Sequence, residues 1–422
     1  MGRELKHTEI GDIPVDWELQ TFDETFRVIS HNTLSRENLN NRCGAVRNIH
    51  YGDILTKFTE ILDCSEDDIP FVNDLSLLSS STQLLQDGDV VIADTAEDET
   101  VGKVTEVQNL GNGKLVAGLH TIPCRVKKGN FAPGWLGYYM NSFLFHGQIL
   151  PFITGIKVSS ISKSAISEAL ILVPPIEEQE KIIQSLNEIH LLITAEIKIV
   201  NKIKFVKDGC LSKMFPKKGE NAPKMRLPGF TGDWEQRKLG ELGEIMTGST
   251  PSTSKSGYYA EDGIPWVTPT DINSLLISKT PKRLSEEGMK VARLVPANTI
   301  LCTCIASIGK NALLTVKGSF NQQINSLTPN DKNDAYFLLT ESELWSDKMK
   351  RMAALGTMQI VNKTDFSELT TMVPMIDEQK KIGEYFSNLD RLITLHQRKC
   401  DKYASIKKGM MNNLLTGKIR LV

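Results

Sequence analysis

Two long stretches of the chain carry apolar residues at steps of three and four, the spacing that places them on one face of an α-helix. In the first stretch they are Ile182, Leu186, Ile189, Ile193, Ile197, Val200, Ile203, Val206 and Met214. In the second they are Ile382, Phe386, Leu389, Ile393, Cys400, Tyr403, Ile406, Met410 and Leu414. Prolines followed by an acidic first turn precede the first stripe, which is typical of a helix start: Pro174, Pro175, Glu177 and Glu178. We therefore predict two long helices, each with a stripe that needs a partner.

The most economical partner for each stripe is the other helix, in a coiled-coil-like pair. Packing of each helix on its own globular domain is the alternative. The residues predicted to form the helix pair or a subunit interface are Ile182, Leu186, Ile189, Ile193, Val200, Ile203, Ile382, Phe386, Leu389, Ile393, Tyr403 and Met410.

The start of each predicted helix is a repeated segment. Val173-Pro174-Pro175-Ile176-Glu177-Glu178-Gln179 returns as Val373-Pro374-Met375-Ile376-Asp377-Glu378-Gln379, an offset of 373 − 173 = 200. Fainter matches pair Trp17 with Trp234, Gly102-Lys103 with Gly309-Lys310, and Lys163 with Lys363. Residues 40 to 80 and 245 to 290 show no such likeness. The chain is therefore an internal duplication whose frame is shared and whose loops differ, and divergent loops are where recognition usually lies.

Each half is predicted to contain a mixed α/β domain before its long helix. Short strands are expected near Asp89–Ala93 and Thr299–Thr303, with helical segments near Trp135 and Tyr336. The predicted fold class is α+β, with two mixed domains, each followed by a long helix. The predicted boundaries are 1–172 for the first domain, 173–215 for the first helix, 216–230 for a Pro- and Gly-rich linker, 231–372 for the second domain, 373–415 for the second helix and 416–422 for a tail.

Composition agrees with more than one domain, since 422 residues exceed what one hydrophobic core usually supports. The net charge of −2 does not by itself suggest a nucleic-acid partner. Acidic residues gather in the first variable region, whereas basic residues follow the two predicted helices. Those basic stripes fit either a solvated helix face or contact with a phosphate backbone, and both interpretations stay open.

The chain has no apolar run of bilayer length and no signal-peptide pattern after Met1, so we expect a cytoplasmic protein. Its seven cysteines are scattered, and only Cys302 and Cys304 are close in sequence. This odd, unpaired arrangement favours reduced, buried thiols over disulfides or a zinc site.

Catalytic motifs are missing from the sequence. It contains neither a glycine-rich phosphate loop nor the Asn-Pro-Pro-aromatic tetrapeptide of an amino-methyltransferase. Glu378-Gln379-Lys380 could be half of a nuclease Glu-x-Lys metal site, but its repeat, Glu178-Gln179-Glu180, lacks the lysine. We therefore expect neither a catalytic residue nor a metal site in this chain.

The duplication together with both Pro-x-Ile-acid-Glu-Gln segments resembles the DNA-specificity (S) subunits of type I restriction-modification systems. The resemblance covers nearly the whole chain and includes Trp17, Trp234, Gly257-Tyr258-Tyr259, Gly263-Ile264-Pro265-Trp266-Val267 and Leu414-Leu415-Thr416-Gly417-Lys418-Ile419. It implies that each globular part is a target-recognition domain that reads one half of a bipartite sequence in double-stranded DNA. It also implies that the long helices pack antiparallel as a spacer, with pseudo-twofold symmetry.

The resemblance also implies the partners. An S subunit recruits two modification (methyltransferase) subunits and, for cleavage, two restriction subunits, which are ATP-dependent endonucleases and translocases. S-adenosylmethionine, ATP and magnesium would then belong to those partners. This chain itself would be a subunit without catalysis or a cofactor.

Candidate DNA-binding residues can be named from their chemistry, because lysines suit phosphates and amides can pair with base edges. In the first domain they are Lys103, His120, Lys157, Ser159, Ser160 and Lys163. In the second they are Lys255, Tyr258, Tyr259, Lys310, Asn321, Gln322, Gln323, Gln359 and Lys363. For each of them, a role in ordinary surface or core packing is the alternative. Trp17 and Trp234 belong to the repeated frame, and we assign them to domain packing.

Two rival functions remain. One is a self-sufficient fused methyltransferase or nuclease, which the missing motifs disfavour. The other is a coiled-coil scaffold that binds proteins but not DNA, which the divergence of the loops disfavours.

Overall fold

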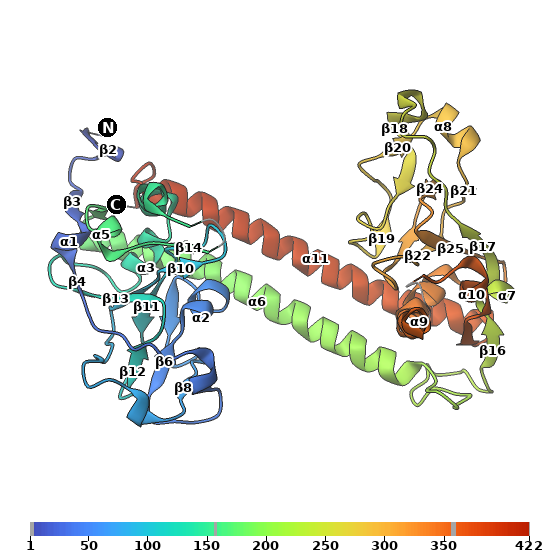
Figure 1. The fold of residues 1–422 in the computed structure, drawn as a ribbon, viewed down its shortest axis with the longest axis horizontal. Helices are drawn as coiled ribbons and strands as arrows, with labels where there is room; N and C mark the ends of the chain where they lie inside the picture. The colour runs from blue at the N-terminus through green and yellow to red at the C-terminus, as the bar shows by residue number, and fades with distance from the viewer. Residues whose placement is uncertain (1–3, 156–157, 356–359, 422) are drawn as a thin grey trace. The chain divides into compact units, whose positions relative to one another are not determined.

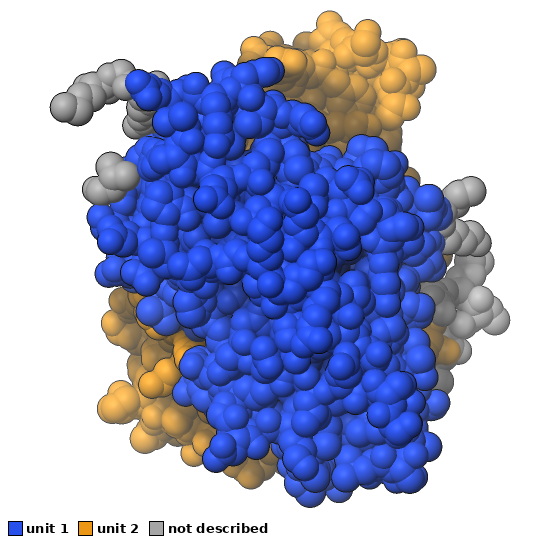
Figure 2. All heavy atoms as spheres, turned by 90° about the vertical axis from the view of Figure 1, so that its left-hand side faces the viewer, with its two compact units in different colours: residues 1–195, 399–422 blue, residues 196–398 orange. Residues whose placement is uncertain are grey.

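The structure is a computed structural model that describes residues 4–155, 158–355 and 360–421 (Figure 1). It divides into two compact units, coloured separately in Figure 2. The first unit comprises residues 1–195 and 399–422, and the second comprises residues 196–398. Both long helices therefore contribute to both units.

The first unit is built on two mixed sheets. A five-stranded sheet has the order β4 (Phe26–Val28), β13 (Thr121–Val126), β9 (Val90–Ala93), β11 (Val104–Gln108) and β7 (Ile61–Asp63). A four-stranded sheet has the order β12 (Leu115–Ala117), β6 (Arg47–Ile49), β8 (Phe71–Val72) and β5 (Leu39–Asn40). All four residues of β9 are buried, as expected for a central strand made of apolar residues.

The second unit repeats this architecture. Its five-stranded sheet has the order β17 (Gly243–Thr247), β25 (Ile324–Pro329), β22 (Thr299–Thr303), β23 (Asn311–Leu314) and β19 (Leu276–Ile277). Its four-stranded sheet has the order β20 (Arg283–Leu284), β18 (Tyr259–Val267), β24 (Gly318–Phe320) and β21 (Leu294–Val295). In both five-stranded sheets only the last pair is parallel, β11 with β7 and β23 with β19. The internal duplication predicted from the sequence is thus confirmed in the fold.

A two-stranded ribbon links the beginning and end of each domain in the same register. In the first unit β3 (Glu18–Thr21) pairs with β15 (Leu170–Val173), and in the second β16 (Glu235–Lys238) pairs with β26 (Thr370–Val373). The remaining strands of the first unit are β1 (Leu5–Thr8), β2 (Gly11–Pro14), β10 (Thr95–Ala96) and β14 (Ser159–Ser160). The shorter helices are α1 (Phe22–Thr25), α2 (Tyr51–Thr56), α3 (Trp135–Met140), α4 (Phe143–Ile149), α5 (Lys163–Ile166), α7 (Leu239–Leu242), α8 (Glu286–Val291), α9 (Ala335–Leu355) and α10 (Lys363–Glu368).

The two long helices are confirmed as α6 (Ile176–Met214) and α11 (Ile376–Leu414). In the second unit Lys207 Nζ lies 2.9 Å from Asp390 Oδ1, and Cys210 Sγ lies 3.3 Å from Tyr385 Oη. Residue numbers thus rise along α6 as they fall along α11, so the helices run antiparallel. Among the described residues, neither of them nor any other helix is long and apolar enough to cross a membrane.

The predicted interface residues of α6 and α11 are all at least partly buried. Ile182 and Leu186 join the core of the first unit, where they share a cluster with Leu414 of α11. Ile382 and Phe386 join the core of the second unit together with Met214 of α6. Ile189 and Val200 are buried as well, and the partly buried members are Ile193, Ile203, Leu389, Ile393, Tyr403 and Met410.

Three further members of the predicted stripes are exposed: Ile197, Val206 and Ile406. These three were not among the predicted interface residues, and one partner helix covers a narrower strip than the apolar stripe that the sequence supplies.

Both repeated tryptophans serve packing, as predicted. Trp17 is fully buried in the core of the first unit, and Trp234 is 3% exposed in the core of the second. All seven cysteines are free thiols, and six of them are buried. The exception is Cys43, which lies exposed in a turn where its N–H donates to the Asn40 side chain.

Candidate nucleic-acid interface

The repeated glutamine of each helix start ties the long helix to its domain. Gln179 Oε1 accepts the Ala132 N–H at 2.9 Å, and its Nε2 donates to the Pro174 carbonyl at 2.8 Å. Gln379 does the same with the Asp334 N–H at 3.0 Å and the Pro374 carbonyl at 2.9 Å. Both side chains are buried. The motif therefore fixes the direction in which each helix leaves its domain.

The repeated glutamate that precedes each glutamine accepts hydrogen bonds from an arginine of a distant segment. Arg420 donates to Glu178 at 2.6 Å, and the Trp17 indole N–H donates to the same carboxylate at 2.9 Å. In the second unit Arg226 donates twice to Glu378, at 2.7 and 2.6 Å. These bonds raise the pKa of both arginines. Glu178 lies in the acidic first turn of α6, as predicted, and it also accepts the bonds from Arg420 and Trp17.

These carboxylates are not arranged as a nuclease site. Glu178 and Glu378 are both about 2% exposed and are occupied by arginine. Within residues 4–155, 158–355 and 360–421, no group of three or more His, Cys, Asp or Glu residues could hold a metal ion.

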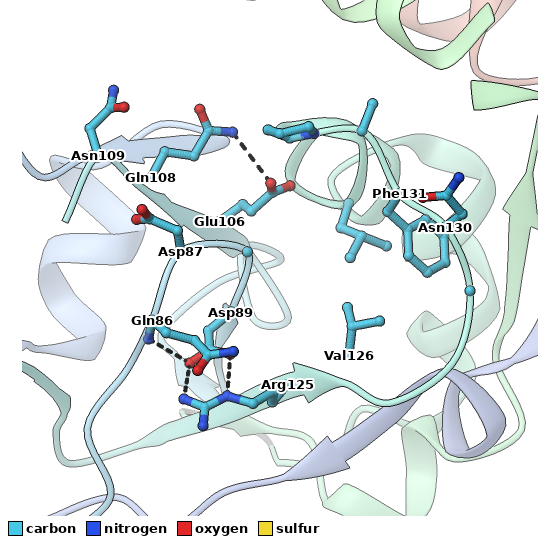
Figure 3. Close-up of a pocket in the computed structure, with 15 residues that line it drawn as sticks. Gln86, Asp87, Asp89, Glu106, Gln108, Asn109, Arg125, Val126, Asn130 and Phe131 are labelled. Carbon is cyan, nitrogen blue, oxygen red and sulfur yellow. Dashed lines mark hydrogen bonds and ion pairs between the residues drawn. The ribbon is translucent and has the colours of Figure 1, made fainter. Parts of the chain in front are cut away.

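One hollow in the first unit is lined by charged side chains that are already engaged in structural hydrogen bonds. It measures about 470 Å³ and lies beside Glu106, Asp89 and Arg125 (Figure 3). Glu106 accepts the N–H groups of Gly134 and Gly137 at 2.5 and 2.8 Å, and burial raises its pKa. Arg125 donates to both oxygens of Asp89, at 2.8 and 2.6 Å. The charged side chains in this hollow hold the fold.

In the first domain, several of the predicted DNA-binding residues lie around the two-stranded ribbon of β10 and β14, which we call the first edge. Ser159 and Ser160 form β14, which pairs with β10. Lys163 is exposed at the start of α5, where the Ser162 hydroxyl caps the helix by accepting the Ala165 N–H. His120 is exposed, and its Nδ1 lies 3.2 Å from the Thr95 hydroxyl of β10. Lys157 lies outside the described residues.

Lys103 has a different environment. Its ammonium donates to the carbonyls of Leu55 and Phe58, both at 3.1 Å, at the end of α2. Partial burial lowers the pKa of Lys103. These bonds hold α2 against the sheet, so this lysine is committed to the fold.

Sequence reasoning missed three further members of the first edge. The Tyr51 ring contacts both His50 and His120, with centroid distances of 4.7 and 5.2 Å. Burial is the main cause of the lowered pKa values of His31 and His50, and the charges of Lys163, Asp94 and His120 also act on His31. No sequence motif joins these residues, because His50 and Tyr51 begin α2 whereas His31 lies in the segment after β4.

In the second domain the predicted amides lie next to one another, but they have different roles. Asn321 is 7% exposed, and its amide donates to Gln323 Oε1 at 3.0 Å. This bond orients the Gln323 side chain. Because Asn321 is buried, its own side chain is not available to contact DNA. Gln322 is exposed and accepts the Thr250 hydroxyl.

The aromatic part of this set lies on the neighbouring loop. The Tyr259 hydroxyl donates to the Pro251 carbonyl at 2.8 Å. Lys255 is exposed, with its ammonium 5.3 Å from the centre of the Tyr258 ring. Pro251 directly follows Thr250, so the loop that carries Lys255 also contacts Gln322. Gln359 lies outside the described residues.

The second domain also presents basic residues at its edge. Lys363 is exposed at the start of α10, which Asn362 caps by accepting the Asp365 N–H at 2.9 Å. Lys310 lines a hollow of about 460 Å³ together with Lys350, a residue that sequence reasoning missed. Lys350 has no counterpart in the repeat, which is why comparison of the halves did not reveal it.

The comparisons with known proteins agree with this arrangement. Residues 231–402 match the family described as the type I restriction modification DNA specificity domain. A chain of Methanocaldococcus jannaschii assigned as the MjaX type I restriction enzyme specificity subunit is 25% identical over 434 aligned residues, which cover 99% of this chain and 97% of that one. The second half of the chain thus matches this family, and the chain over nearly its whole length is similar to a type I specificity subunit.

Shorter and structural matches point to the same family. The HindI specificity subunit of Haemophilus influenzae is 31% identical over 163 residues, which cover 36% of this chain and 35% of that one. The crystal structure of a type I S subunit from M. genitalium matches with a TM-score of 0.60 at 13% identity, covering 98% of this chain and 99% of that one. The structural match supports the S-subunit fold.

Proposed function

We propose that this chain is the DNA sequence-specificity subunit of a type I restriction-modification complex. Each of its two domains reads one half of a bipartite target in double-stranded DNA. The paired helices α6 and α11 set the distance between the halves and recruit the other subunits.

The observation that carries this proposal is the contrast between frame and loops. The two domains share the order of both sheets and the register of the ribbons β3–β15 and β16–β26. Their exposed edges differ, with His120, Ser159 and Ser160 in one and Gln322, Lys255 and Lys310 in the other. Two domains with the same strand order but different exposed residues are suited to bind two different DNA sequences in the same way.

The helices supply a surface for partner proteins. Within the second unit α6 exposes Phe205 at 80% and Ile197 at 46%, and α11 exposes Leu395 at 49%. Within the first unit α6 exposes Leu191 at 66%. Protein interaction sites are marked by exposed apolar patches, and we propose that these side chains belong to one. We assign this surface to two modification subunits, one for each copy of the repeat, with two restriction subunits joining for cleavage.

Catalysis then belongs to the partners. The modification subunits would bring S-adenosylmethionine, and the restriction subunits ATP and magnesium. This chain would contribute DNA recognition and geometry without a reaction centre of its own. The arginine-bound carboxylates Glu178 and Glu378 support that division.

Domain exchange tests the modular part of this function. Residues 22 to 165 of this chain are replaced by the same region of a related S subunit, and DNA methylated by the resulting complex is sequenced. We expect one half of the target to change while the other half and the gap are retained. Changes in both halves would refute separate recognition by the two domains.

A further inference from the structure

A three-segment hydrogen-bond ladder recurs at the exposed edge of both units. In the first unit the Asp94 N–H donates to the His120 carbonyl at 3.1 Å, and the Ile161 N–H donates to the Asp94 carbonyl at 2.9 Å. In the second unit the Cys304 N–H donates to the Gln323 carbonyl at 2.8 Å, and the Val361 N–H donates to the Cys304 carbonyl at 3.0 Å.

The ladder identifies structurally equivalent residues that the sequence does not align visibly. His120 directly precedes β13, and Gln323 directly precedes β25, the corresponding strand of the second sheet. The two residues therefore occupy the same place in the repeated frame while offering different side chains. A residue that differs at an otherwise conserved place in two homologous domains is suited to distinguish their targets.

A lysine lies beside the ladder in both units. Lys163 follows Ile161 by two residues, and Lys363 follows Val361 by two residues. Each is exposed and begins a helix capped by the residue before it, Ser162 or Asn362. The phosphate backbone is the same in every half-site, so an unchanged lysine at this place fits a phosphate contact.

The side chains of Gln323 and His120 each have one polar atom bonded to a neighbouring residue and a second polar atom available for a ligand. Gln323 Oε1 accepts the Asn321 amide at 3.0 Å, and no described residue bonds its Nε2. His120 Nδ1 lies 3.2 Å from the Thr95 hydroxyl and 3.4 Å from Asp94 Oδ1, and no described residue bonds its Nε2. A neighbour that fixes the rotamer lowers the entropy lost when the free atom meets a base.

The ladder places Lys163 and His120 in one patch, because His120 and Ile161, which lies two residues before Lys163, both bond Asp94. The charges of Lys163, Asp94 and His120 all act on the His31 imidazole, whose pKa is lowered mainly by burial. The histidine and the lysine of the first unit are thus close enough to contact neighbouring parts of one DNA segment.

We propose that His120 and Gln323 are the corresponding base-reading residues of the two domains, and that Lys163 and Lys363 bind the adjacent phosphates. This inference rests on the proposed function. The free Nε2 of Gln323 donates to an acceptor on a base edge, namely guanine O6 or N7, adenine N7 or thymine O4. His120 reads its base through Nε2, while Thr95 and Asp94 hold the other ring nitrogen.

Reciprocal substitutions test the inference on the full chain assembled with its modification subunit. The wild-type target is first read from methylated DNA. Binding of His120→Gln and Gln323→His is then measured against duplexes altered at each position of that target. We expect each variant to lose or change discrimination at one position, by roughly 10- to 100-fold. The two affected positions should lie in different halves.

Matched variants separate base reading from other effects. Lys163→Ala and Lys363→Ala should weaken binding to all duplexes alike and reduce its salt dependence, because phosphates carry no sequence information. His7→Gln serves as a control, since this side chain of the same unit is 88% exposed and lies on the β1–β2 ribbon. If His120→Gln lowers the melting temperature of the chain, His120→Asn is used instead.

The outcomes distinguish the inference from the function on which it rests. A wild-type complex without a bipartite target would refute the proposed function. A bipartite target whose discrimination stays unchanged in both variants, or changes in the same half for both, would overturn the assignment of His120 and Gln323.

Discussion

Glu341 makes the stability of the second unit depend on pH. It lies on α9, is 2% exposed, and its Oε2 has no hydrogen-bond partner among the described residues. Burial raises the pKa of its carboxyl to about 8, from an ordinary value of 4.5. The folded chain therefore holds this proton more tightly than the unfolded chain does. The resulting stabilisation is complete below about pH 4.5 and is lost as the pH rises through about 8.

The size of the effect follows from the difference between the two pKa values. At about 1.4 kcal/mol for each pH unit, the difference between 8 and 4.5 corresponds to about 4 to 5 kcal/mol. Glu341→Gln keeps the shape of the side chain and removes the titration. We expect the variant to gain stability relative to the wild type as the pH rises from 5 to about 8.5.

Denaturant unfolding of the purified full chain measures this difference across that pH range. Asp347→Asn is the control, because Asp347 is an exposed acid on the same helix. Any fixed cost of placing an amide in the core cancels when only the change with pH is compared. Wild-type and Glu341→Gln curves that stay parallel from pH 5 to 8.5 would show that Glu341 does not titrate as its burial implies.

Two further predictions concern the arginine bonds and the partner surface. Arg226→Leu leaves the Glu378 carboxylate buried without its partner and should destabilise the second unit by about 3 to 5 kcal/mol in denaturant unfolding. Arg237→Leu, which breaks only the exposed ion pairs with Glu235 and Glu241, should cost less than about 1 kcal/mol, and equal losses would contradict the role of the buried pair. Phe205→Ser should leave the melting temperature of the isolated chain nearly unchanged but weaken its assembly with the modification subunit. Undiminished assembly in light scattering would remove Phe205 from that interface.

The parts of the fold that could be predicted from the sequence are those encoded by local patterns. The spacing of apolar residues from Ile182 onward fixes a helix, because neighbouring positions alone decide which face is apolar. The repeated helix start was visible because the offset of 200 persists without a gap. The roles of its residues were not visible, since Glu178 meets an arginine 242 positions away.

The candidate site was predicted less completely, because it depends on which loops meet. Asn321 has the chemistry of an adenine reader, but burial assigns it to holding Gln323. Lys103 and Lys310 match in the repeat, but their environments differ. Lys103 donates to the carbonyls at the end of α2, whereas Lys310 lines a hollow in the second unit. The equivalence of His120 and Gln323 appears only in the backbone ladder, because the residues on either side of them have diverged.

In the proposed function, two domains read two half-sites at a distance set by α6 and α11. Inserting four residues near Thr194 lengthens α6 by about 6 Å and turns its stripe by only about 40°, so helix packing should survive. The measurement is the target sequence methylated in cells that express the inserted chain with its modification subunit. We expect a changed gap or lost modification, with both half-site sequences retained wherever activity remains. An unchanged gap at full activity would contradict the proposed role of α6 and α11 in setting the distance.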